Sequence, residues 1–257
     1  MSTAVLWPAT IGPCRRWLPA NNHPSYLVNK TKVRSILAGP LLLSVARADL
    51  GHQQDFALYV RSSTIKKVTL IKQRRLLDAF FKVDEAVLRH ERFDGSLSPE
   101  LNRLCLERGD GVTALLYQPQ SDSLVLVRQF RYPAWVRQGP GWILETVAGM
   151  LDKAEAPQET MRREILEETG YQVCNLQHVS TFYLTPGGSS ERIFLYYGEV
   201  AVDERRESGG GLADENEDIE VIEIAVDDAF AAVDQGEIVD AKTLIALMWF
   251  RNRRLQT

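Results

Sequence analysis

Residues 149–171 read GMLDKAEAPQETMRREILEETGY, and this stretch decides the fold of the chain. Its second half predicts a helix. Pro157 suits the first turn, where its missing N–H needs no partner, and Gly170 can end the helix in the left-handed conformation. Three carboxylates stand at positions i, i+3 and i+4 and therefore share one face of this helix: Glu164, Glu167 and Glu168.

Three like charges at this spacing destabilise a helix by about a few tenths of a kcal/mol per pair. Met161 and Ile165 border the acidic face, which indicates that the face points toward the protein and not into bulk water. Burial raises the cost of the repulsion unless a cation lies among the carboxylates. Oxygen ligands without a neighbouring His or Cys favour magnesium, calcium or manganese. The alternative, a solvated acidic face, is common in glutamate-rich helices but leaves the complete pattern of residues 149–171 unexplained.

The bulk composition excludes several classes of protein. The chain has 257 residues, enough for one good core and a small second lobe. Its formal net charge is −4, which does not favour a nucleic-acid partner. The four histidines and three cysteines are scattered and predict no zinc site.

Residues 1–62 differ from the rest, because Pro, Asn, Trp and Ser are mixed there without a clear period. Such a segment predicts a poorly structured extension and not a packed domain. The apolar run at residues 36–45 resembles a signal peptide, but it begins late and carries Gly39 and Pro40 in its centre. It is also too short to span a membrane. A real extension and a wrongly chosen upstream start codon are the two interpretations left open.

The chain from residue 63 onward is regular and predicts a mixed sheet with a few helices packed on it. The Asp-Gly pair at 94–95 gives a hairpin turn signal. Asp227 and Asp228 can cap a short helix, and Asp240 can cap a last one. The predicted strands are residues 67–71, 80–92, 112–117, 124–130, 142–147, 176–184, 193–200 and 219–226.

The pattern of residues 149–171 resembles the Nudix box: Gly, five residues, Glu, seven residues, Arg-Glu, an aliphatic residue, any residue, Glu-Glu, any residue, Gly and an aliphatic residue. Every fixed position matches, and the one departure is Tyr171 in the last aliphatic slot. In that family the box is a loop–helix–loop that holds divalent metals against a diphosphate. The resemblance implies an α/β fold, the Nudix α/β/α sandwich with a mixed sheet, plus an amino-terminal β-strand subdomain.

The same resemblance implies a metal centre. Glu164 and Glu168 would be metal ligands, Glu167 would support them in catalysis, and the backbone carbonyl of Ala148 would be a further ligand. The implied cofactor is Mg²⁺, with Mn²⁺ as an alternative.

Residues 64–254 are similar to the bacterial ADP-ribose pyrophosphatases of the Nudix family. Pro186 stands sixteen positions after Gly170 and matches the family's substrate marker. The relatives that cleave GDP-mannose share much of this stretch, so both substrates stay open.

The resemblance also implies residues that bind the substrate. Arg131 and Arg103 match positions that grip the diphosphate and the terminal ribose, and a guanidinium fork suits phosphate oxygens. Glu191 matches a residue that faces ribose. Phe80 or Phe81 matches an aromatic residue stacked on adenine. Without the resemblance, each of these residues would be read as a surface charge or a core aromatic.

The acidic segment 214–218 follows three glycines and precedes a predicted strand, so it can form a mobile loop over the site. By resemblance, Glu217 joins the metal and water network, and Glu215 is the candidate general base. A solvated acidic run is the alternative interpretation.

We therefore predict three regions: the extension at 1–62, an amino-terminal β subdomain at 63–110 for dimerisation and the substrate pocket, and a Nudix hydrolase domain at 111–257. The predicted reaction is Mg²⁺-dependent hydrolysis of ADP-ribose to AMP and ribose 5-phosphate by a cytoplasmic homodimer that binds neither nucleic acid nor membrane. A GDP-mannose or UDP-glucose pyrophosphatase is the first alternative. A Nudix module that senses a nucleotide without cleaving it is the second; such modules commonly lose box carboxylates, and all of them are present here.

Overall fold

The computed structural model describes residues 66–151 and 155–256 of the chain. The predictions for residues 1–62 therefore lie outside the described residues. Within those two described ranges, no helix is long and apolar enough to cross a membrane.

The first described element is a three-stranded antiparallel sheet of order β1-β2-β3. Phe80 and Phe81, predicted to begin a strand, instead lie in the turn between β1 and β2. The turn at 94–95 is confirmed: Gly95 has φ +82°, and Asp94 accepts the backbone N–H of Ser96. The strand bounds are β1 Val68–Asp78, β2 Lys82–His90 and β3 Leu101–Glu107.

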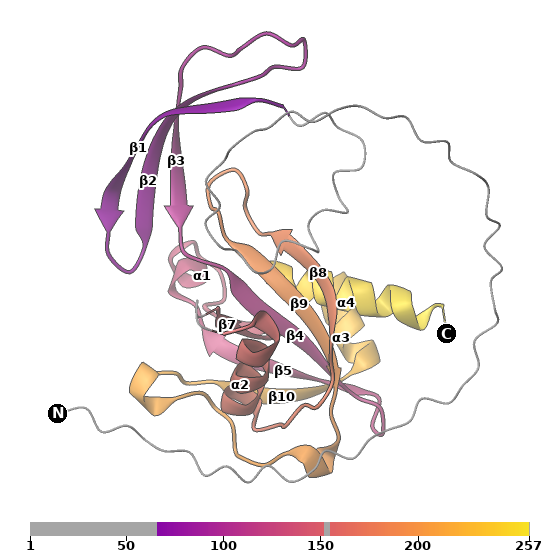
Figure 1. The fold of residues 1–257 in the computed structure, drawn as a ribbon. Helices are drawn as coiled ribbons and strands as arrows, with labels where there is room; N and C mark the ends of the chain where they lie inside the picture. The colour runs from indigo at the N-terminus through magenta and orange to yellow at the C-terminus, as the bar shows by residue number, and fades with distance from the viewer. Residues whose placement is uncertain (1–65, 152–154, 257) are drawn as a thin grey trace. The chain divides into compact units, whose positions relative to one another are not determined.

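A seven-stranded mixed sheet forms the centre of the fold (Figure 1). Its main order is β10-β5-β4-β9-β8, in which β4 and β9 run parallel and the other neighbours antiparallel. β6 pairs with β5, and β7 pairs with β4. The bounds are β4 Gly111–Gln118, β5 Ser123–Phe130, β6 Trp142–Glu145, β7 Val147–Met150, β8 Leu176–Tyr183, β9 Arg192–Glu199 and β10 Glu220–Ala225.

The single strand predicted at 142–147 was wrong, because the chain changes partner strand inside it. Glu145 in β6 lies opposite Val127 of β5, whereas Val147 in β7 lies opposite Ala114 of β4. Between them, the backbone N–H of Thr146 leaves the ladder and donates to a side-chain hydroxyl of the last helix at 2.8 Å. An apolar run carries no signal for such a change of partner.

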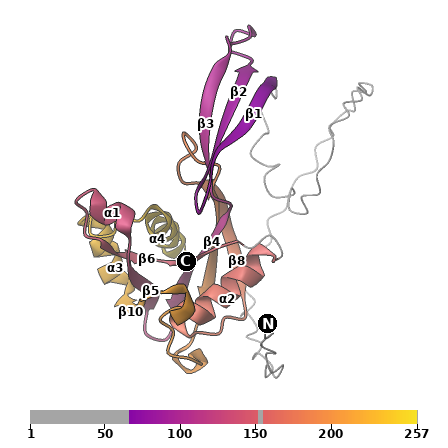
Figure 2. The same ribbon diagram turned by 90° about the vertical axis from the view of Figure 1, so that its left-hand side faces the viewer.

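Helices cover both faces of the central sheet and make the predicted α/β/α sandwich (Figures 1 and 2). Alternate residues of β5 point to opposite faces, so Val125 and Val127 pack with α2 while Leu124 and Leu126 pack with α3 and α4. The helix bounds are α1 Tyr132–Val136, α2 Pro157–Thr169, α3 Val226–Asp234 and α4 Ala241–Arg254. The sequence did not predict α1, which has five residues and buries none of them.

The predicted ends of α2 are confirmed. Pro157 lies in its first turn, and Gly170 ends it with φ 76° while its N–H donates to the carbonyl of Leu166 at 2.9 Å. Met161 and Ile165 are fully buried in the core beneath the helix. The acidic face therefore borders the protein interior, as its apolar neighbours predict.

The predicted caps of the two later helices differ in outcome. Asp240 caps α4, since its carboxylate accepts the N–H of Thr243 at 2.9 Å. Asp227 and Asp228 do not cap α3; they lie in its first turn, and Ala225 is the N-cap residue. The helix begins earlier because Val226, the residue directly after β10, is fully buried in the core.

Tyr171, the departure from the box pattern, joins three distant parts of the domain. Its ring is fully buried after the end of α2. Its hydroxyl donates to Glu223 of β10 and accepts from the side-chain amide of Gln118 in β4, both at 2.7 Å. Burial, and then the bond to Glu223, raise the pKa of Tyr171 to about 12. An aliphatic residue at this position could not make these bonds.

Tyr171→Phe should lower the free energy of unfolding by about 1–3 kcal/mol, because the fully buried amide of Gln118 would lose this acceptor. Urea denaturation measures the change. Tyr132→Phe is the control, since Tyr132 is exposed and its variant should stay within about 0.5 kcal/mol of the parent. Equal stability of the two variants would contradict the role given to the buried hydroxyl.

Candidate active site

A cleft of about 790 Å³ opens beside α2 and the edge of β7. The box contributes Gly149, Glu164 and Glu167 to its lining, with the neighbouring Ala148. Glu145, four positions before Gly149, also lines the cleft. Other lining residues come from parts of the chain far from the box: Phe81, Arg108, Arg131, Glu191, Glu217 and Lys242. The acidic face of α2 therefore looks into a cleft, as the spacing of its carboxylates indicates.

The three box glutamates have different surroundings. Glu168 is only 2% exposed, and its carboxylate accepts the N–H of Ala148 at 3.3 Å. Arg163 pairs with Glu167 at 2.8 Å and with Glu164 at 3.1 Å. One guanidinium thus pairs with two carboxylates, and its hydrogen bond to Glu167 orients that side chain.

This arrangement raises the proton affinity of two of the carboxylates. Burial raises the pKa of Glu164 to about 7; Arg163 opposes the shift, and the charges of Glu167 and Glu217 add to it. Burial, followed by the charge of Glu164, raises the pKa of Glu168 well above its usual value. A carboxylate in such a place is stabilised by a proton or by a cation.

Gly149 leaves room for one of these carboxylates. A Cβ atom at Gly149 would lie 2.1 Å from Cδ of Glu164, which is far inside van der Waals contact. The end of a glutamate side chain can move away, but it would then leave the place it now has in the cleft. The glycine that opens the box therefore positions Glu164.

The donor set fits a hard divalent cation. Glu164, Glu168 and the carbonyl of Ala148 would hold it, and all supply oxygen, the ligand atom that Mg²⁺ and Mn²⁺ prefer. Among residues 66–151 and 155–256, no three acidic, His or Cys side chains are already gathered closely enough to form a metal cluster. Glu168 is bonded to a backbone N–H, and so is Glu217, which accepts the N–H of Leu212 at 3.0 Å. To bind a metal together, Glu168 and Glu217 would therefore have to exchange these backbone N–H partners for the cation.

The metal-free protein should melt at a lower temperature as the pH rises from about 5 to about 8. The folded chain holds the proton of Glu164 up to about pH 7, whereas the unfolded chain releases it near 4.5. The unfolded state then binds fewer protons, so the free energy of unfolding falls as pH rises. Mg²⁺ should raise the melting temperature more at the higher pH, where protons no longer compete for the carboxylates.

Thermal melts with EDTA or Mg²⁺ across this pH range test the effect. Glu164→Gln removes one of the two shifted carboxyls and should flatten the pH dependence of the metal-free protein. An unchanged slope in that variant would show that Glu164 does not carry the effect.

The predicted acidic loop lies between Gly209 and β10 and contains the 3-10 helix Ala213–Glu215. Glu217 lines the cleft, and its charge acts on both Glu164 and Glu168. The side chain of Glu215 lies outside the described part of the structure. The catalytic roles of both loop glutamates stay predictions.

The predicted substrate residues fall into two groups. Phe81, Arg131 and Glu191 line the cleft, and Glu191 pairs with Arg108 at 3.3 Å. The residues that do not line it are Phe80, which is 86% exposed in the β1–β2 turn, Arg103 on β3 and Pro186 in the loop between β8 and β9. The single chain thus brings together half of the predicted set.

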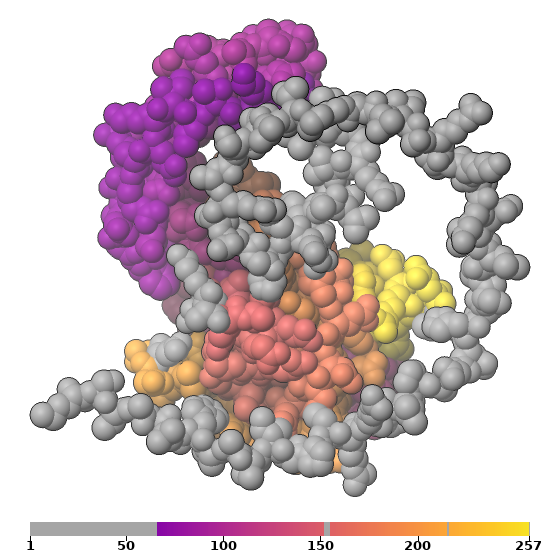
Figure 3. Space-filling model, viewed as in Figure 1, coloured from indigo at the N-terminus to yellow at the C-terminus, as the bar shows by residue number. Residues whose placement is uncertain are grey.

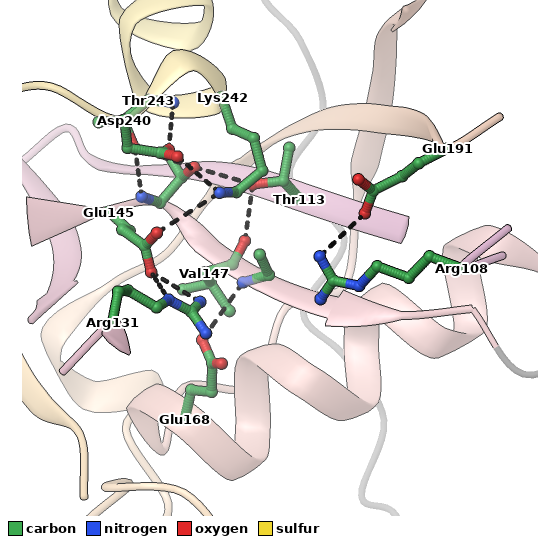
Figure 4. Close-up of polar contacts among 12 residues, drawn as sticks. Arg108, Thr113, Arg131, Glu145, Val147, Glu168, Glu191, Asp240, Lys242 and Thr243 are labelled. Carbon is green, nitrogen blue, oxygen red and sulfur yellow. Dashed lines mark hydrogen bonds and ion pairs between the residues drawn. The ribbon is translucent and has the colours of Figure 1, made fainter. Parts of the chain in front are cut away.

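The sequence analysis missed a charged network whose members Arg131, Glu145 and Lys242 line the cleft (Figure 4). The carboxylate of Glu145, only 2% exposed, pairs with Arg131 at 2.7 Å and with Lys242 at 3.5 Å. Lys242 also pairs with Asp240 at 2.7 Å. A charged residue near the end of an apolar strand, four positions before Gly149, was the signal for Glu145. Lys242 shows no comparable signal, because it stands in the first turn of a helix like any surface lysine.

Buried carboxylates that face a cleft, opposite arginine and lysine side chains, define a site for a divalent metal and a phosphorylated substrate. Comparison with known proteins agrees with that class. The family described as the NUDIX domain matches residues 107–247. The chain therefore belongs to the Nudix family, and it is a Nudix hydrolase.

Individual relatives carry two different names. The chain is 39% identical over 185 residues to ADP-ribose pyrophosphatases of Escherichia coli and Shigella flexneri, which covers 72% of this chain and 88% of each relative. It is 37% identical over 191 residues to GDP-mannose pyrophosphatase of Citrobacter koseri, which covers 74% of this chain and 98% of that relative.

Proposed function

We propose that this enzyme hydrolyses the diphosphate of ADP-ribose to AMP and ribose 5-phosphate. The observation that carries the proposal is the composition of one cleft: Glu164 and Glu167 of the box line it together with Arg131, Glu191 and Phe81. In this proposal the box carboxylates bind the metal and Arg131 binds the diphosphate. Glu191 faces the ribose, and Phe81 stacks on the base.

Different residues of the chain bind the metal and remove the proton in the proposed reaction. Glu164, Glu168 and the carbonyl of Ala148 would hold Mg²⁺, for which Mn²⁺ could substitute. When bound, the metal neutralises charge on the diphosphate oxygens and lowers the pKa of a coordinated water. Glu215 or Glu217 removes a proton from the attacking water. Water attacks one phosphorus, and the other phosphate leaves with the bridging oxygen.

In this proposal Arg131 binds the diphosphate. Its guanidinium lies at the cleft, and Glu145 holds it through two nitrogens, Nε at 3.0 Å and Nη2 at 2.7 Å. A guanidinium held on one side by a buried carboxylate is oriented before substrate arrives, so less side-chain entropy is lost on binding. Glu191, which pairs with Arg108 at 3.3 Å, would face the ribose.

Cleavage of GDP-mannose or another nucleotide sugar is the second candidate, because relatives with both names have similar identity to this chain. Phe81 at the cleft, with Phe80 edge-on to it at 4.9 Å between ring centroids, favours a purine base over the smaller uracil of UDP-glucose, and both ADP-ribose and GDP-mannose supply a purine. A sensor that does not cleave its ligand is the third candidate. The complete set of box carboxylates argues against it.

We also propose a homodimer in which a second copy covers the three-stranded sheet. Every residue of β1 is exposed in the single chain, and the space-filling view shows this indigo strand at the surface (Figure 3). Its exposed apolar residues are Val68, Leu70, Ile71, Leu76 and Leu77. Such a surface is typical of a protein interface. Sedimentation equilibrium should give twice the chain mass of 29.0 kDa, and a monomer at micromolar concentration would contradict the proposal.

The cytoplasm is the proposed compartment.

Substrate profiling tests the choice of substrate. Purified full-length protein with Mg²⁺ should have its highest kcat/KM for ADP-ribose, followed by GDP-mannose and UDP-glucose. Phe81→Leu should raise KM for ADP-ribose more than KM for UDP-glucose, whose smaller uracil stacks less well, by about 10-fold if one stacking contact is lost. A higher kcat/KM for GDP-mannose would replace ADP-ribose as the substrate while leaving the site intact.

A further inference from the structure

Three consecutive glycines begin the acidic loop, and all three have left-handed backbone conformations. The φ angles of Gly209, Gly210 and Gly211 are 67°, 105° and 81°. Residues with side chains rarely adopt such angles, and three in succession need glycine. These residues lie against the last turn of α2 and not in open solvent, as their contacts show.

The glycines cap the end of the box helix with their backbone. The N–H of Gly210 donates to the carbonyl of Glu168 at 2.8 Å, and the N–H of Gly211 donates to the carbonyl of Glu167 at 3.1 Å. Carbonyls in the last turn of a helix have no partner inside the helix, so these bonds satisfy them. The side chains of Glu167 and Glu168 thus belong to the acidic face of α2, while their backbone carbonyls accept hydrogen bonds from the loop.

The approach is so close that a side chain would prevent it. A Cβ atom at Gly209 would lie 2.6 Å from the carbonyl oxygen of Glu168 and 2.6 Å from the carbonyl carbon of Thr169. Both are backbone atoms of α2, which cannot move without unwinding the helix end. At Gly211, a Cβ atom would lie 2.6 Å from both Cβ and Oε2 of Glu217.

The loop then closes on the same glycines. The N–H of Ile219 donates to the carbonyl of Gly210 at 3.2 Å. Inside this closure, Glu217 accepts the N–H of Leu212 with its carboxylate at 3.0 Å, and its own N–H donates to the carbonyl of Leu212 at 3.2 Å. The place of Glu217 at the cleft is therefore fixed by backbone bonds that start from α2.

We propose that residues 209–211 form a positioning element, which holds the acidic loop in a fixed position against the metal-binding turn of α2. The inference rests on the proposed function and deepens it. Glu167 lines the cleft, and Glu168 is buried beside it with its carboxylate on the N–H of Ala148. Because the backbone carbonyls of these two residues hold the loop, the loop glutamates and the box carboxylates share one backbone anchor. Loss of that anchor moves Glu217 away from Glu164 and Glu168 without removing any carboxylate.

Gly209→Ala tests the element against a matched control, Gly236→Ala. Both glycines have similar left-handed φ angles, 67° and 75°, but a Cβ at Gly236 would meet no atom within 4 Å. Gly236 follows α3 and does not line the cleft. The pair therefore separates the cost of an unusual φ angle from the loss of contact with α2.

The full-length variants are compared by kcat and KM for ADP-ribose and GDP-mannose, by a Mg²⁺ titration, and by calorimetric titration of the substrate-free proteins with Mn²⁺. We expect Gly209→Ala to lower kcat about 10–100-fold, as small misplacements of catalytic groups do, with KM within about threefold. Its half-saturating Mg²⁺ and its Kd for Mn²⁺ should both rise at least about threefold. Gly236→Ala should keep all four values near those of the parent.

Equal kcat and equal Kd for Mn²⁺ in the two variants would overturn the inference. Should Gly209→Ala fail to fold, Gly211→Ala decides, because the three atoms nearest to its Cβ belong to the side chains of Glu217 and Ile219 and not to the backbone of α2. Unchanged kcat and Kd for Mn²⁺ in that variant would also overturn the inference. A parent protein that cleaves neither ADP-ribose nor GDP-mannose would refute the proposed function. The Mn²⁺ titration would still test the positioning element, because it does not depend on turnover.

Discussion

Glu168→Gln should lower kcat by about 10²–10³-fold or more while the fold survives, because metal-bound charge stabilisation is worth several kcal/mol. The side chain is 2% exposed, and its one described hydrogen-bond donor is the N–H of Ala148. Glutamine keeps the shape and an oxygen acceptor for that N–H. It removes only the charge that a divalent cation would bind.

The stability of this variant should separate a metal ligand from a structural residue. Burial raises the pKa of Glu168 well above its usual value, so its charged form is unfavourable in the metal-free protein. Glu168→Gln should therefore melt no lower than the parent in EDTA at pH near 8, and Mg²⁺ should raise its melting temperature less than that of the parent.

Glu159→Gln is the matched control on the same helix. Glu159 lies in the first turn of α2, its side chain is 64% exposed, and it pairs with Arg162. Its variant should turn over within about twofold of the parent, as surface substitutions do. Near-normal turnover of Glu168→Gln at saturating Mg²⁺ would contradict the metal-ligand role.

Glu215→Gln should lower kcat by about 10²–10⁴-fold, the range that general-base catalysis contributes. KM and the Mg²⁺ requirement should change little, because only an interaction made in the transition state is lost. Glu217→Gln should also raise the Mg²⁺ concentration for half activity, since Glu217 lines the cleft and its charge acts on Glu164 and Glu168.

A steady-state comparison of these two variants over a Mg²⁺ titration measures the difference. Glu220→Gln is a suitable control, because Glu220 begins β10 and its exposed side chain pairs with Arg128 outside the cleft. Should both loop variants keep kcat within about threefold of the parent, the loop would be a solvated acidic run. The general base would then have to be sought among the box glutamates.

The sequence predicted best what local residue types determine. The ends of α2 follow from Pro157 and Gly170, and the burial of its acidic edge follows from Met161 and Ile165. The strand β4 and the first five residues of β5 are buried on both faces, so they are mostly continuous apolar runs in the sequence. Each of these features can be read from a window of a few residues.

Features that depend on distant partners could not be read in this way. The break at Thr146 depends on a hydroxyl 97 positions later, and the pairing of Glu145 with Lys242 joins a strand to the last helix. The network of Tyr171 spans 53 positions to Gln118 and 52 to Glu223. No spacing in the chain indicates such contacts, because they arise from the path of the sheet.

The most direct test of the central claim is to incubate the purified full-length protein with ADP-ribose and separate the products by chromatography. The account predicts AMP and ribose 5-phosphate in equal amounts with Mg²⁺ or Mn²⁺, and neither product in excess EDTA or from Glu168→Gln on the same time scale. Release of ADP and ribose, or equal product formation with and without divalent metal, would contradict it.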